Sequence, residues 1–99
     1  MTTPPASPAP AKASRDVVLA GRAGLHARPA ARVVEIARRY ASAITLIHGE
    51  VVASAKDLLD VLYLAAPSGA TLLIRAEGFD ATAAVDALAV YLASLAEDA

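Results

Sequence analysis

The sequence passes from an apolar segment into an amphipathic helix at Gly24-Leu25-His26-Ala27-Arg28-Pro29-Ala30. Val17-Val18-Leu19 precedes this heptapeptide, and alanines and valines at helical spacing follow it. Because a proline fits the first turn of a helix, where its missing N–H would have no partner, Pro29 predicts a helix beginning near Ala27. His26 would then lie at the helix start, where unpaired N–H groups and the dipole favour a phosphate-bearing group.

The remaining periodicity predicts seven alternating elements. Strands are expected at residues 15–20, 43–47, 51–53 and 71–76, and helices at residues 27–40, within 54–66, and at 81–95 after Asp80 as the N-cap. The order β-α-β-β-α-β-α predicts an α+β fold, an open-faced β-sandwich with three helices on one face of a four-stranded antiparallel sheet. Residues 1–14, rich in Pro and Ala, are expected to be a disordered tail, and residues 15–99 a single domain.

Composition excludes several classes of function. The chain has 99 residues, no cysteine, two histidines and a net charge of −1, which argue against disulfides, metal sites and wholesale nucleic-acid binding. Four aromatic residues and no Trp make base-stacking platforms improbable. No apolar run approaches the ~18 residues of a membrane helix, and the first 14 residues lack the apolar region of a signal peptide. We therefore expect a cytoplasmic protein without cofactor, metal or stable membrane association.

His26 is the candidate reactive residue. A neutral imidazole, common at cellular pH, can attack a phosphoryl group, and the N–H groups of Ala27 and Arg28 could then bind the phosphate oxygens. The Arg28 guanidinium adds a two-point donor, and hydrogen bonds to charged groups, at roughly 1.5–3 kcal/mol each, outweigh a dipole term of roughly 0.3–1 kcal/mol. Alternatively, His26 is only a surface residue or cap. His48, beside Gly49 in a predicted hairpin, is expected to be an exposed turn residue without a role.

The heptapeptide with its surrounding element order resembles the active-site segment of the histidine-containing phosphocarrier proteins (HPr) of the bacterial sugar phosphotransferase system, over roughly residues 15–96. The resemblance implies the same fold and a phosphoryl carrier rather than an enzyme. It implies that His26 accepts phosphate on Nδ1 from phosphorylated enzyme I, itself charged by phosphoenolpyruvate, and donates it to an enzyme IIA domain. It also implies a monomer.

Leu58, Leu59 and Leu62 lie on the short second helix, which cannot bury them all. They are either core residues or a partner surface, since exposed apolar groups near a charged site commonly mark one. In the family the corresponding helix presents apolar groups to enzyme I and enzyme IIA. Arg28 and Arg32, with Arg38 as a further candidate, would form the basic rim that meets acidic partners.

Two positions depart from the family pattern. Asp57 stands where the family often has a serine that a dedicated kinase phosphorylates, and it is either a capping residue alone or also a fixed imitation of phosphoserine. Ala23 replaces a polar residue that helps orient the histidine, which leaves backbone N–H groups or Arg22 for that task.

These departures leave the pathway open. One alternative is an HPr-like paralogue in a regulatory phosphorelay of the nitrogen or dihydroxyacetone-kinase type, which would keep His26 and Arg28 and change the partner surface. Another is a binding module with the same fold and no phosphoryl transfer, although His26, Arg28 and Pro29 occur together here.

Overall fold

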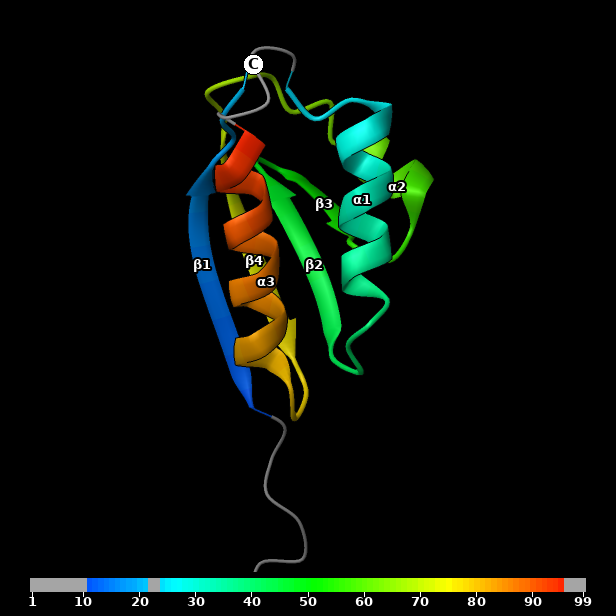
Figure 1. Ribbon diagram of the computed structural model, residues 1–99, viewed down its shortest axis with the longest axis vertical. Helices are drawn as coiled ribbons and strands as arrows, with labels where there is room; N and C mark the ends of the chain where they lie inside the picture. The colour runs from blue at the N-terminus through cyan, green and yellow to red at the C-terminus, as the bar shows by residue number, and fades with distance from the viewer. Residues whose placement is uncertain (1–10, 22–23, 96–99) are drawn as a thin grey trace, which may run out of the picture.

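The computed structural model of the chain describes residues 11–21 and 24–95 (Figure 1). Its elements in chain order are β1 (Lys12–Val18), α1 (Ala27–Ala37), β2 (Ala43–His48), β3 (Val51–Ser54), α2 (Leu58–Tyr63), β4 (Thr71–Glu77) and α3 (Ala81–Ser94). The strands form one antiparallel sheet in the order β1-β4-β2-β3. The predicted order and the open four-stranded sheet with three helices are confirmed.

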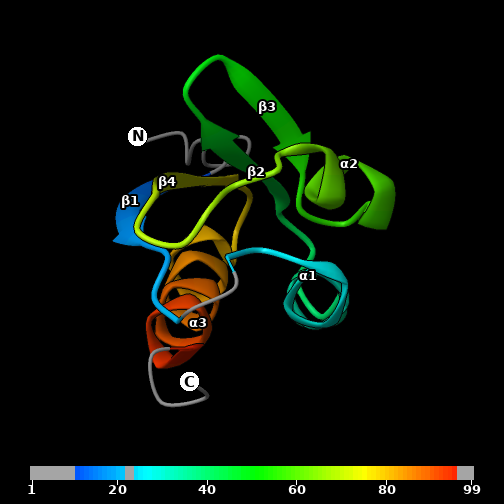
Figure 2. The same ribbon diagram turned by 90° about the horizontal axis from the view of Figure 1, so that it is seen from above.

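The sheet has one covered and one open face. Along β4, Leu72, Ile74 and Ala76 are buried, whereas the alternate residues Thr71, Arg75 and Glu77 are exposed. Successive side chains of a strand point to opposite faces, so this alternation requires helices on one side only. Seen from above, α1 and α3 lie on the same side of the sheet, and α2 packs beside α1 and β3 (Figure 2).

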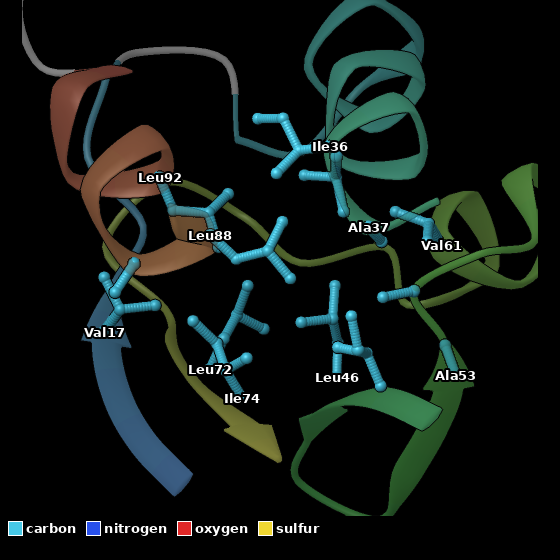
Figure 3. Close-up of a cluster of buried hydrophobic side chains, with 14 of the residues drawn as sticks. Val17, Ile36, Ala37, Leu46, Ala53, Val61, Leu72, Ile74, Leu88 and Leu92 are labelled. Carbon is cyan, nitrogen blue, oxygen red and sulfur yellow. The ribbon is translucent and has the colours of Figure 1, made fainter. Parts of the chain in front are cut away.

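The core lies between the sheet and the helices (Figure 3). Leu46, Leu72 and Ile74 from the strands are fully buried, as are Leu88 of α3 and Val61 of α2. Each such side chain contributes about 1.5–3 kcal/mol by leaving water. The buried alanines of α3, such as Ala84 and Ala89, lie where this helix packs against β1 and β4.

The first strand begins earlier than the sequence predicts. Residues 12–14, assigned above to the tail, pair with the end of β4, with Lys12 opposite Glu77 and Ser14 opposite Arg75. Backbone pairing needs no apolar side chains, so composition gave no sign of it. The strand also ends at Val18 rather than at residue 20, because the Leu19 N–H and carbonyl bond instead to the loop before β4. Residues 1–10 of the expected tail lie outside the described residues.

Two further expectations are corrected. α1 ends at Ala37, and the next residues form tighter turns in which Arg39 N–H donates to Ile36 and Tyr40 N–H to Ala37. Asp80 occupies the N-cap position of α3, but its side chain makes no capping hydrogen bond. Its carboxylate instead accepts hydrogen bonds from the N–H groups of Ala41 and Ser42.

Candidate functional site

His26 is the N-cap residue of α1 and is exposed. Its backbone is extended, with φ −100° and ψ −172°, and its carbonyl accepts the first helical hydrogen bond, from Ala30 N–H at 2.9 Å. Its imidazole makes no capping hydrogen bond. The ring therefore stands at the helix start, as predicted, with its nitrogens turned to no partner among the described residues.

The first turn of α1 offers free donors beside His26. Pro29 has no N–H, and within residues 11–21 and 24–95 the N–H groups of Ala27 and Arg28 have no hydrogen-bond acceptor. These are the orphan donors that every helix start carries, and an anion can bind there. Pro29 is itself buried, so it also fixes this turn against the core.

The arginines of α1 differ in what they contact. Arg28 is exposed and pairs with no carboxylate in the described part of the chain. Arg32 and Arg39 both pair with Glu35, at 2.6 and 3.2 Å. Arg38 donates through Nε to the Lys56 carbonyl at 3.1 Å and pairs with no carboxylate among residues 11–21 and 24–95. Of the expected basic rim, Arg28 and Arg38 thus keep their full charge, whereas the charge of Arg32 is partly offset.

The loop before His26 is held by the loop between α2 and β4. Leu25 N–H donates to the Ala66 carbonyl at 2.9 Å, and the Ser68 hydroxyl donates to the Gly21 carbonyl. Gly24 has φ +70°, and a Cβ there would lie 2.6 Å from the Ala66 oxygen. Only glycine accepts both that conformation and that contact. The sequence analysis did not anticipate that this loop supports His26, because nothing in the local sequence signals a contact between distant loops.

The short helix α2 exposes part of its apolar surface. Leu59 and Tyr63 are 77% and 79% exposed, Leu58 is 39% exposed, and Leu62 is half-buried against the core. Val61, which the sequence analysis did not single out, is the residue by which α2 enters the core. α2 packs against α1, the helix whose N-cap is His26 (Figure 2).

Asp57 is the N-cap of α2, as expected, and accepts a hydrogen bond from the Asp60 N–H at 3.1 Å. The Asp60 side chain in turn accepts from Ser54 N–H. The first of these hydrogen bonds shows that Asp57 acts as a capping residue of α2. Arg22 and Ala23, the other residues considered for the site, lie outside the described residues.

The expectation that His48 is an exposed turn residue is wrong. This residue ends β2, is half-buried, and its Nδ1 lies 3.3 Å from the Leu64 carbonyl at the end of α2. Because a carbonyl only accepts, Nδ1 carries the proton in this contact. The hairpin was predicted at the correct position in the sequence, but the packing of α2 determines what surrounds the His48 side chain.

The pKa of Asp80, at the start of α3, is lowered by the hydrogen bond from the Ser42 hydroxyl and by the N–H groups of Ala41 and Ser42. Across residues 11–21 and 24–95, no three His, Cys, Asp or Glu side chains group as metal ligands. In the same residues no helix is long and apolar enough to cross a bilayer.

Comparison with known proteins identifies the family. Residues 13–94 match the PTS-HPr family, described as the PTS HPr component phosphorylation site. The chain belongs to the HPr family. Its members are phosphocarriers that work with the enzymes of the phosphotransferase system in a phosphorelay.

Relatives carry both HPr and NPr names. The chain is 40% identical over 82 residues to the phosphocarrier protein HPr of Haemophilus influenzae, covering 83% of this chain and 96% of that one. It is 38% identical over 77 residues to the phosphocarrier protein NPr of Shewanella violacea, covering 78% and 85%. The crystal structure of HPr from Bacillus anthracis superposes with a TM-score of 0.79 at 34% identity, covering 83% and 98%.

Proposed function

We propose that this chain is a phosphoryl carrier that takes a phosphoryl group from phosphorylated enzyme I on His26 and passes it to an enzyme IIA domain in sugar uptake. The observation that supports it is the exposed His26 imidazole at the start of α1, beside the N–H groups of Ala27 and Arg28, which have no acceptor in the described part of the chain. The proposal includes a monomeric carrier in the cytoplasm that is itself no enzyme.

In the proposed step, the lone pair of a neutral His26 ring nitrogen, Nδ1 as the family implies, attacks phosphorus. A nitrogen–phosphorus bond forms on His26 as the bond to the donor breaks and the donor keeps that electron pair. Donors around the phosphate would be the Ala27 and Arg28 N–H groups and the Arg28 guanidinium, which matches phosphate geometry at two points. Transfer to the acceptor domain is the same exchange in the opposite direction, so no net reductant or oxidant is required.

Partner recognition is proposed to use α2 and the basic side of α1. Leu58 and Leu59 offer exposed apolar area, and Leu62 contributes its accessible part. Arg28, Arg32 and Arg38 carry the positive charge that would steer acidic partners. Such charges act mainly on the rate of association with the partner and on the dependence of that rate on salt concentration.

The test is incubation with phosphoenolpyruvate and enzyme I, followed by intact-mass measurement. An acid-labile gain of one phosphoryl group in the wild type, absent in His26→Ala, is the expected result. Absence of any gain with every enzyme I encoded alongside the chain would refute the carrier proposal and favour a binding module without transfer.

A second candidate is a regulatory phosphorelay of the nitrogen type, in which His26 and Arg28 keep their roles. The match to the NPr of Shewanella violacea at 38% identity favours it. Phosphorylation rates measured side by side with a sugar-type and a nitrogen-type enzyme I distinguish the two. The faster donor at equal concentration identifies the pathway.

A further inference from the structure

Ala65 has an unusual backbone conformation. Its φ is +48°, and among the described residues it is the one position other than glycine with a positive φ. An L-residue is disfavoured there because its Cβ approaches the following carbonyl oxygen. Ala65 follows Leu64, the C-cap of α2, and its N–H donates to the Leu62 carbonyl. Helices often end on a left-handed residue at this position, usually glycine, so an alanine there is held by the structure around it.

The hydrogen bonds on either side of Ala65 explain what enforces the conformation. Before it, the Leu64 carbonyl accepts from His48 Nδ1 at 3.3 Å, which links the end of α2 to β2. After it, the Ala66 carbonyl accepts from Leu25 N–H at 2.9 Å. The left-handed residue lies between two carbonyls that must point to different parts of the molecule.

The Ala65 side chain itself contributes little to packing. Ala65 is exposed, while its neighbours Leu64 and Ala66 are buried. A residue change at Ala65 therefore acts through the backbone angles it permits. The consequence reaches the site because Leu25, held by Ala66, directly precedes His26.

We propose that Ala65 is a positioning residue for His26. Its left-handed conformation directs the Ala66 carbonyl to Leu25 N–H and so sets the backbone from which the imidazole projects. This rests on the proposed function, since it is phosphoryl transfer that makes the direction of the imidazole matter. Small displacements of a reacting group are costly in rate, which gives the loop its influence.

The segment around Ala65 also connects His26 to the proposed partner surface on α2. α2 carries the exposed Leu59 and ends at Tyr63, two residues before Ala65. A partner that contacts α2 thereby contacts the helix whose end sets the Ala66 carbonyl. Docking and the orientation of His26 share this short segment.

The experiment compares substitutions by the backbone angles they tolerate. Ala65→Gly adopts a positive φ freely, and Ala65→Val and Ala65→Thr resist it because they are β-branched. Two quantities are measured, the hydrogen exchange of the Leu25 amide relative to the amides of the central strand β4, and kcat and KM for phosphorylation by enzyme I. The ratio of exchange rates removes any effect of global stability.

We expect Ala65→Gly to stay within about twofold of wild type in both quantities, because the hydrogen bond is kept. In Ala65→Val, relative protection of Leu25 should fall about five- to tenfold, as for the loss of one hydrogen bond. kcat should fall several-fold with KM unchanged, because the docking surface is intact. Ala65→Thr should follow Ala65→Val.

Ala83→Gly, on the exposed side of α3, is the matched control for lost stability. It should lower the unfolding midpoint without changing Leu25 relative protection or kcat. Unchanged Leu25 protection and kcat in both β-branched variants would overturn the inference, as would a loss in Ala65→Gly equal to that in Ala65→Val. If the proposed function is wrong, the wild type itself takes up no phosphate. The hydrogen-exchange ratio of the Leu25 amide still tests the effect of Ala65 on the backbone in that case.

Discussion

Gly24 packs so closely against Ala66 that a Cβ on Gly24 would lie 2.6 Å from the Ala66 carbonyl oxygen. The contact brings the loop before His26 against the loop after α2, and the Leu25 hydrogen bond to the same carbonyl fixes their relative position. Two segments some forty residues apart in the chain thus build one platform for the imidazole.

Gly24→Ala should therefore destabilise the fold by roughly 2–4 kcal/mol, from an unfavourable positive φ together with the overlap. Gly69→Ala is the control, because Gly69 also has a positive φ, +86°, but none of the atoms that the structure describes lies within 4 Å of an added Cβ. It should cost about 1 kcal/mol. Urea denaturation of both variants measures the difference, and equal losses would contradict the role of the contact.

Arg28→Ala should slow phosphoryl exchange with enzyme I about tenfold or more, since a charged hydrogen bond to phosphate is worth roughly 1.5–3 kcal/mol. Arg39→Ala also removes one positive charge, but Arg39 is paired with Glu35 and lies just beyond the C-terminal end of α1, away from His26. Its effect on the exchange rate should be small. Equal slowing by the two substitutions would show that net charge, and not the position of Arg28, is what matters.

Asp80 should make stability depend on pH at the acid end. Its pKa is lowered in the folded state by the Ser42 hydroxyl and the N–H groups of Ala41 and Ser42. A lowered carboxyl pKa contributes stability above the unfolded value of about 3.9, and this is lost as pH falls through the folded pKa. Asp80→Asn should therefore lower Tm at neutral pH.

The gap in Tm between wild type and Asp80→Asn should narrow as pH drops below about 4. Asp86→Asn is a suitable control, because Asp86 makes an exposed pair with Arg15 at 3.6 Å that contributes little. A constant gap from neutral pH into the acid range would mean that the Asp80 charge is not what the loop before β2 requires.

Asp57→Ala should cost about 1 kcal/mol of stability through the lost cap to Asp60 N–H. Asp57→Ser should restore most of it, since serine caps nearly as well. The family resemblance implies that Asp57 replaces a regulatory serine, so we expect a serine-directed kinase to leave the wild-type chain unlabelled. Radiolabel on Ser54 of the wild type would contradict this.

Much of the fold could be predicted from local pattern. Alternation along β4 and helical spacing along α1 depend on neighbours in the chain, so the element order and the sheet class follow from them. Pro29 likewise predicts the start of the helix at which His26 lies exposed. The early start of β1 at Lys12 could not be predicted, because its pairing with Glu77 depends on a strand sixty-five residues away.

Asp80 and His48 are residues whose hydrogen-bond partners could not be predicted from the sequence. Each was interpreted from its position, as a cap and as an exposed turn residue, and each instead bonds across the fold, Asp80 to Ser42 and His48 to Leu64. A polar side chain forms hydrogen bonds with groups that the packing of the fold brings near it. For these two residues those groups lie far away in the sequence, so the local pattern does not reveal them.

The sequence by itself determined the family, the element order and the histidine at a helix start, because these depend on local spacing and on residue types in succession. Only the tertiary structure decided which arginines of α1 remain unpaired, how far each α2 leucine is exposed, and that Ala65, Ala66 and Gly24 support His26. Those features arise when distant segments pack together, and side chains and carbonyls acquire partners only then.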